Sequence, residues 1–169
     1  MRKITVIMLV LSLMVSLNVF AFEFEGYKWG TPMAKMKKIL EEKNKAPVPL
    51  DSGRGLTYND VIVGAPCVIS LYFTPMTKLL AYIQVAWSAT DIGADVRELI
   101  QRRNGVPYYY GDLKLRDFNT QFRWGQATGE RIMLDYRYQQ TLLSYYSGDY
   151  YSKYQDELGN KPENLKHKL

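Results

Sequence analysis

Apolar and polar residues alternate along the middle of the chain, from residue 61 to residue 87. Apolar side chains occupy most odd positions of this stretch, whereas the even positions mix polar residues with tyrosine. Successive side chains of a strand point to opposite faces of a sheet. The pattern therefore predicts two β-strands, Cys67–Thr74 and Leu79–Trp87, joined by a turn at Pro75. Their odd side chains are expected in a core, and their even side chains on a wetter surface.

Two segments carry apolar residues at the spacing of an amphipathic helix. The first is 33–44, where Thr31 is the expected N-cap and Pro32 the expected first residue. The second begins at Asp91, its expected N-cap, and ends near Arg103, before an Asn-Gly-Val-Pro stop. Charged residues occupy the opposite side of both segments. Each helix is therefore expected to cover a core.

The chain also shows an internal repeat. The two helices match each other at an offset of sixty residues, and the strands match at sixty-three. The strand matches are Ile69, Leu71 and Phe73 with Ile132, Leu134 and Tyr136, and Leu79–Tyr82 with Leu142–Tyr145. The pattern predicts two halves, about 22–87 and 88–150, each built as αβββ. The predicted strands are Leu56–Val63, Cys67–Thr74 and Leu79–Trp87, then Gln121–Gln126, Arg131–Arg137 and Leu142–Ser147.

Neither predicted half could bury its apolar side chains alone. Placed side by side, the strands would form one antiparallel sheet with the helices on one face, an α+β fold. The other face would stay open to water. A last helix is expected at Asp149–Leu158, within a single domain that spans 22–158, and a polar tail is expected at 159–169.

The first residues have the layout of a secretory signal peptide. Arg2 and Lys3 precede an apolar stretch, and Val19 and Ala21 stand at the −3 and −1 positions of a cleavage site before Phe22. The apolar stretch is shorter than the roughly 20 residues that a spanning helix needs. We therefore expect residues 1–21 to be a signal peptide, with no integral membrane span after cleavage. The protein would then reside in the bacterial periplasm or be secreted.

Charge and cysteine content narrow the classes of partner. The chain has 22 basic and 17 acidic residues, a net charge of +5 that includes Arg2 and Lys3 of the leader. This excess is mild and scattered, which argues against nucleic acid and anionic membranes as partners. Cys67 is the only cysteine, so no internal disulfide can form. It is expected to be a small buried hydrophobe, with an intermolecular disulfide or a reactive thiol as alternatives.

Residues with catalytic chemistry are sparse. The only histidine, His167, lies in the polar tail, which argues against a catalytic triad and against a zinc site. A hydrolase that uses Asp135 and Glu130 stays open as a less favoured alternative. The sequence predicts no catalytic residue, no metal site and no cofactor, and an enzyme is the minority interpretation.

Tyrosine is the stronger clue, since the chain has 14 of them. Tyrosine and arginine are enriched among the residues that dominate binding at interfaces. The binding residues predicted for the open sheet face are Tyr72, Tyr82, Gln84, Arg131, Asp135, Arg137 and Tyr145. Two alternatives remain open: the tyrosines could stabilise the sheet as cross-strand pairs, or the face could be a homodimer interface.

Two motifs carry a family resemblance: WGTPMAKMKKIL at 29–40 and DIGADVRELIQRRNGVP at 91–107. Their tandem layout resembles the β-lactamase inhibitor proteins, and is similar to the small outer-membrane assembly lipoproteins that have one such repeat. The chain departs from both, because the inhibitors carry intradomain disulfides and the assembly proteins a lipidated cysteine. The resemblance implies a protein-binding module whose open sheet face is the contact surface.

The expected function is therefore that of an exported binding protein. The partner would be another envelope protein held on the open face, and the role that of an adaptor, inhibitor or assembly factor. A small-ligand or glycan-binding envelope protein is the alternative, in which the tyrosines would stack on a sugar.

Overall fold

The computed structural model describes residues 24–88, 92–111, 118–126, 129–137 and 140–159. In chain order, these residues form α2 (Met33–Glu42), β1 (Val48–Pro49), β2 (Gly55–Ile62), β3 (Ala65–Phe73), β4 (Leu80–Trp87), α3 (Gly93–Asn104), β5 (Tyr109–Gly111), β6 (Phe118–Gly125), β7 (Arg131–Arg137), β8 (Gln140–Tyr146) and α4 (Gly148–Gly159). The predicted α+β class is confirmed.

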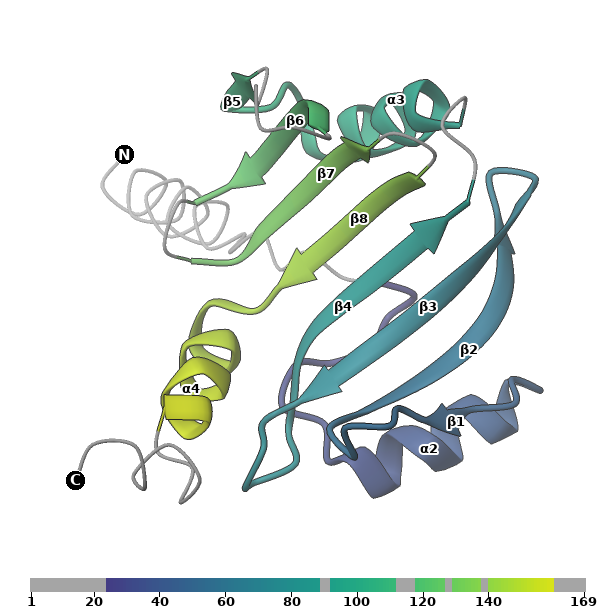
Figure 1. Cartoon of the computed structure of the whole chain (residues 1–169), viewed down its shortest axis with the longest axis vertical. Coiled ribbons are helices and arrows are strands. Elements are labelled where there is room, and N and C mark those ends of the chain that lie inside the picture. The colour runs from purple at the N-terminus through teal and green to yellow at the C-terminus, as the bar shows by residue number, and fades with distance from the viewer. Residues whose placement is uncertain (1–23, 89–91, 112–117, 127–128, 138–139, 160–169) are drawn as a thin grey trace, which may run out of the picture.

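One antiparallel sheet contains the strands of both halves. Its order is β1-β2-β3-β4-β8-β7-β6-β5, so the last strands of the two halves, β4 and β8, are neighbours at its centre (Figure 1). From either edge of the sheet to its centre, the strands of one half follow each other in chain order, from the first to the fourth. A duplication would give this arrangement, and the two-repeat origin stays a prediction.

Two short edge strands were not predicted from the sequence. β1 pairs with β2 through Val48 and Pro49, and β5 pairs with β6 from Tyr109 to Gly111. Each half therefore has four strands in place of the predicted three. Segments of two and three residues are too short to show alternation, and proline is tolerated in sheets mainly at edges.

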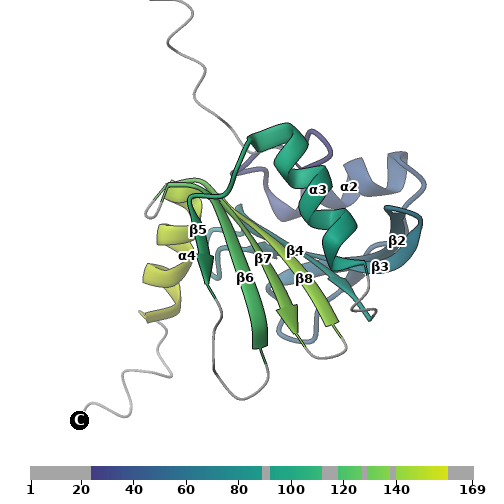
Figure 2. The same ribbon diagram turned by 90° about the horizontal axis from the view of Figure 1, so that it is seen from above.

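Helices α2 and α3 cover the same face of the sheet, as predicted (Figure 2). Met36 and Leu40 of α2 and Val96 and Ile100 of α3 are buried in the cluster that holds the odd-position side chains of β3 and β4. We call this side the helix face and the opposite side the outer face. The third helix, α4, differs, because its tyrosines contact the outer face.

The N-terminal caps of the helices differ from expectation. α2 begins at Met33 with Pro32 in the N-cap position, and Thr31 donates its hydroxyl to the carbonyl of Lys28 instead of capping the helix. The N–H of Met33 donates to the carbonyl of Lys78, in the turn before β4. The turn thus satisfies a helix donor that Thr31 was expected to satisfy. Asp91, the expected cap of α3, lies outside the described residues.

A β-bulge in the first half makes the strand pairing of β3 with β4 differ by one residue from that of β7 with β8. Phe73 pairs with Leu80, but Tyr72 pairs with Tyr82, so one extra residue enters β4 at Ala81. In the second half, Asp135 pairs with Leu142. If Tyr72 matches Asp135 at the predicted offset of sixty-three, Tyr82 then matches Leu142, an offset of sixty. The predicted match of Tyr82 with Tyr145 is wrong, since these two side chains lie on opposite faces.

Candidate functional site

A row of aromatic side chains crosses the centre of the outer face. Tyr72 of β3, Tyr82 of β4 and Tyr146 of β8 occupy successive paired positions. The rings of Tyr72 and Tyr82 stack at 4.2 Å, and those of Tyr82 and Tyr146 at 5.7 Å. We call this row the tyrosine ladder. It spans the boundary between β4 and β8 and therefore ties the two halves together, because each stacked pair adds packing energy across a strand boundary.

Arginine extends the tyrosine ladder by one strand. Arg131 of β7 pairs with Tyr146, and its guanidinium lies 4.7 Å from the ring of Tyr146 and 5.3 Å from the ring of Tyr151. A guanidinium over an aromatic face is a favourable cation–π arrangement. The stacked row thus runs across four strands, from β3 to β7.

Helix α4 covers part of the tyrosine ladder. Tyr151 and Tyr154 meet Tyr82 edge-on, at ring distances of 5.5 and 5.3 Å. Since Tyr72 and Tyr146 stack on Tyr82 as well, the ring of Tyr82 is in contact with four other aromatic rings. Burial raises the pKa of the Tyr82 phenol. Stacking of a sugar on Tyr82 would require α4 and a neighbouring ring to move.

Two contacts outside the tyrosine ladder hold α4 in place. Glu157 is 8% exposed and accepts hydrogen bonds from the backbone N–H groups of Met76 and Thr77, at 2.6 and 3.2 Å. At the other end of α4, the ring of Tyr150 lies against Gly30, where a β-carbon would overlap the ring. Gly30 also has a positive φ of 74°, a conformation that glycine adopts without strain.

The predicted outward residues other than Asp135 separate into three groups. Tyr72, Tyr82, Gln84 and Arg131 lie on the outer face, as the alternation predicts. Tyr145 does not: it is 7% exposed and belongs to the core on the helix face. Its outward orientation was predicted wrongly, and Tyr146 takes the outer position. Arg137 ends β7 opposite Gln140, and its side chain lies outside the described residues.

Asp135 lies on the outer face but is 8% exposed. It accepts a hydrogen bond from the side-chain amide of Gln121, its partner on β6. The oxygen of the same amide accepts a bond from Nε of Arg123 at 2.6 Å. A buried polar group is tolerated when its hydrogen bonds are made. The Asp135 carboxylate is thus part of a row of hydrogen-bonded side chains on the sheet. This arrangement favours a structural role for Asp135 over the alternative of a catalytic role in a hydrolase.

A groove lies beside this chain of polar residues, on the outer face of β6 and β7. It has a volume of about 270 Å³ and is lined by Tyr108, Arg123, Arg131 and Met133. Tyr108 is 50% exposed. We call it the arginine groove. Sequence reasoning did not group Tyr108, Arg123 and Met133 in one site. The alternation of β7, whose odd positions carry Arg131 and Asp135, could have indicated Met133, but β5 and β6 had to be placed in the sheet before the other two could be grouped.

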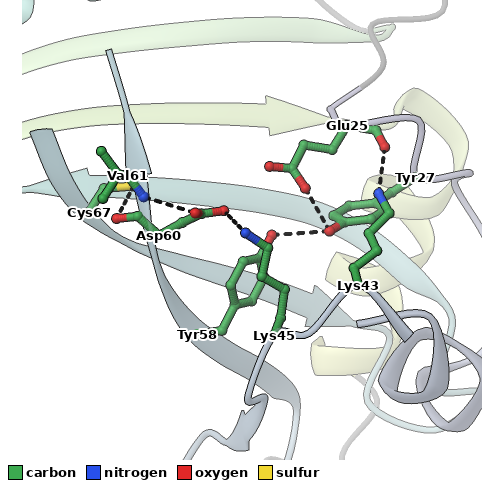
Figure 3. A network of polar contacts seen from close by, with 8 residues as sticks. All are labelled: Glu25, Tyr27, Lys43, Lys45, Tyr58, Asp60, Val61 and Cys67. Carbon is green, nitrogen blue, oxygen red and sulfur yellow. Dashed lines mark hydrogen bonds and ion pairs between the residues drawn. The ribbon is translucent and has the colours of Figure 1, made fainter. Parts of the chain in front are cut away.

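The helix face carries a polar network at the end of α2 (Figure 3). The Tyr27 hydroxyl donates to Oε2 of Glu25 at 2.8 Å and lies 3.2 Å from the hydroxyl of Tyr58. Lys45 donates to Oδ2 of Asp60 at 2.5 Å. This bond lowers the pKa of Asp60 and raises that of Lys45. The network joins three segments: the chain before α2, the chain after it, and β2.

Cys67 lies next to this network, and its thiol is 3.5 Å from the carbonyl oxygen of Asp60. It is buried and free, as expected for a small core residue. Burial is the largest influence on the thiol and raises its pKa to about 11. An unreactive, protonated thiol follows at neutral pH.

A cavity of about 300 Å³ opens between α3 and the sheet on the helix face. Its apolar lining residues are Phe24, Ile62, Trp87, Val96, Leu99, Ile100, Leu143 and the ring of Tyr145. Glu25 and Arg103 complete the lining, and both are exposed. The arrangement is an apolar interior with charged residues at its mouth, which is common in small-ligand sites.

The described residues bring no three His, Cys, Asp or Glu side chains together in a way that could hold a metal ion. Within the same part of the chain, no helix has the length and apolar character to cross a membrane. The predicted signal peptide, 1–21, lies outside the described residues. Comparison of the chain with family models, curated proteins and solved structures found no match.

Proposed function

We propose that this protein is an exported binding protein that holds an acidic segment of another envelope protein in the arginine groove. The observation that carries the proposal is the make-up of the groove: two arginines, a half-exposed tyrosine and a methionine on a sheet face that α2 and α3 leave uncovered. These residue types are enriched at protein interfaces, and tyrosine and arginine dominate their binding energy.

Charge selects the partner. Among the described residues, the lining of the groove carries two positive side chains and no negative one. Asp135, the carboxylate on the outer face of β7, is already hydrogen-bonded by Gln121. Arginine binds carboxylates through paired N–H donors, so a partner segment with aspartate or glutamate would fit the groove.

Preorganisation supports the same role. The side chain of Arg123 is held by Gln121, and that of Arg131 lies over Tyr146 and Tyr151. Side chains that are already positioned lose less entropy on binding than mobile ones. The tyrosines thus contribute in a different way from the initial expectation: Tyr82 and Tyr146 support Arg131 and α4, and the contact with the partner lies further along the sheet.

Export is the other part of the proposal. It rests on the basic start, the apolar stretch and the Val19–Ala21 cleavage motif of the sequence. Cleavage before Phe22 would leave the described fold intact, since its first residue is Phe24. Sequencing the N-terminus of the protein recovered from periplasm or medium tests this step, and an intact Met1 would contradict it.

A pair of variants at one position tests the groove. Met133 lines it without making any of the polar contacts above, so Met133→Glu adds a negative charge and Met133→Lys a positive one of similar size. Immobilised protein is exposed to envelope extract in three forms: unaltered, Met133→Glu and Met133→Lys. We expect one protein to be retained by the unaltered and lysine forms and lost from the glutamate form, with release by salt.

Two results would overturn the proposal. One is equal retention by the glutamate and lysine forms, which would place the contact elsewhere. The other is no retention by any form, provided that all three unfold at similar temperatures.

A further inference from the structure

The cavity between α3 and the sheet is separate from the arginine groove, on the opposite face. We propose that it is a binding site for a small monocarboxylic acid with an apolar tail. The tail would occupy the interior beside Trp87, and the carboxylate would meet Arg103 at the mouth.

Size and lining support an apolar ligand. An apolar cavity of about 150 Å³ stays dry and takes up benzene. This cavity has about 300 Å³, and thus has room for an alkyl or aryl group of roughly ten carbon atoms. The interior residues Ile62, Val96 and Leu143 have apolar side chains that would pack against such a group.

The mouth supplies the polar contacts. Within the described part of the chain, neither the Arg103 guanidinium nor the Tyr145 hydroxyl makes a hydrogen bond or ion pair. The ring of Tyr145 is nonetheless buried, since only 7% of the residue is exposed. The hydroxyl is an available donor at the edge of a largely buried ring, so a ligand oxygen beside it would give it a hydrogen-bond partner. Burial raises the pKa of Tyr145, whereas the charge of Arg103 lowers it, and both residues line the cavity.

Glu25 is the negative residue at the mouth, and one of its carboxylate oxygens is engaged elsewhere. Its Oε2 accepts the hydroxyl of Tyr27 at 2.8 Å, on the side of the polar network (Figure 3). Arg103 is therefore the charged lining residue without a partner among the described residues. A ligand carboxylate would therefore pair with Arg103.

Decanoate and decanol are the probes, because they share a tail and differ in the head group. Binding is measured by calorimetry and by the change in tryptophan fluorescence, since Trp87, one of three tryptophans, lines the cavity. We expect saturable 1:1 binding of decanoate, with decanol about tenfold weaker. Arg103→Met should weaken decanoate about tenfold and leave decanol unchanged, because it removes the charge and keeps the aliphatic stem.

Two further variants complete the test. Arg102→Met is the matched control on the same helix, since Arg102 pairs with Glu98 and does not line the cavity; it should leave both affinities unchanged. Leu99→Trp fills the cavity from its half-exposed rim and should abolish binding of both probes.

Absence of saturable binding of either probe would overturn the proposal, as would unaltered affinity in Leu99→Trp. Equal affinity for acid and alcohol, unchanged in Arg103→Met, would overturn the assignment of the carboxylate. The Arg103 comparison does not depend on the folding of the tryptophan variant. The Arg103 comparison also leaves Met133 unchanged, so the proposals for the cavity and for the arginine groove are tested independently.

Discussion

Glu157 is expected to hold α4 over the tyrosine ladder through one cluster of hydrogen bonds. Its Oε2 accepts the N–H groups of Met76 and Thr77, and its Oε1 accepts the Thr77 hydroxyl at 2.7 Å. The partners lie in the turn between β3 and β4, about eighty residues earlier in the chain. Glu157→Gln keeps the shape of the side chain but removes its charge. One carboxylate oxygen becomes an NH2 group, which faces a hydrogen-bond donor with an N–H group of its own.

The magnitude follows from the exposure of the donors. A hydrogen bond to a charged group contributes about 1.5–3 kcal/mol when both partners are buried. Met76 and Thr77 are exposed, so their freed N–H groups can turn to water. We therefore expect Glu157→Gln to lower the free energy of unfolding by about 1–2 kcal/mol at pH 7. The melting temperature should fall by about 3–8 °C.

The effect should depend on pH. Burial raises the pKa of Glu157, but the hydrogen bonds from Met76 and Thr77 outweigh it, and the pKa lies below its usual range. A carboxyl group with a lower pKa in the folded state stabilises the fold above its unfolded pKa of about 4.3. This contribution is lost as the pH falls through the folded pKa. The difference between the unaltered protein and Glu157→Gln should therefore be present at pH 7 and vanish in acid.

Urea unfolding at pH 7 and pH 3, followed by circular dichroism, measures the effect. Limited proteolysis at pH 7 adds a local readout, since detachment of α4 exposes residues 148–159. Asp156→Asn is the matched control, because Asp156 is the exposed neighbour on the same helix. Equal urea midpoints and equal cleavage for Glu157→Gln and the unaltered protein at pH 7 would refute the reasoning, as would a difference that persists undiminished at pH 3.

Two predictions concern the polar network on the helix face. Asp60→Asn should lower the free energy of unfolding by about 0.5–1 kcal/mol at pH 7, since the bond from Lys45 is partly exposed. Because the pKa of Asp60 is lowered in the folded state, this loss should disappear in acid, and urea midpoints that match those of the unaltered protein at pH 7 would contradict it. Cys67, with its pKa raised to about 11, should react with iodoacetamide at pH 8 roughly a hundredfold more slowly in the native protein than in urea. Rapid labelling of the native thiol would show that it is accessible.

The sequence by itself determined the class of fold and most of its elements. Alternation in β3 and β4 placed the strands within one or two residues, because each has a buried face and a wetter one. Helical spacing likewise located α2, α3 and α4. The orientation of Tyr72 and Tyr82 followed from the same pattern. These features depend on local spacing, which the chain displays directly.

Only the tertiary structure decided which side chains of β8 point to each face of the sheet and which face α4 covers. β8 has large side chains at both parities, such as Leu142, Leu143, Tyr145 and Tyr146, and α4 and the core bury both of its faces. Alternation carries no information about faces in such a strand. The bulge at Ala81 added a one-residue change that no sequence offset shows. The arginine groove and the cavity likewise depend on contacts of β5, β6 and α3 with residues far away in the chain. The spacing of residues along a sequence does not show which distant segments lie close together in space.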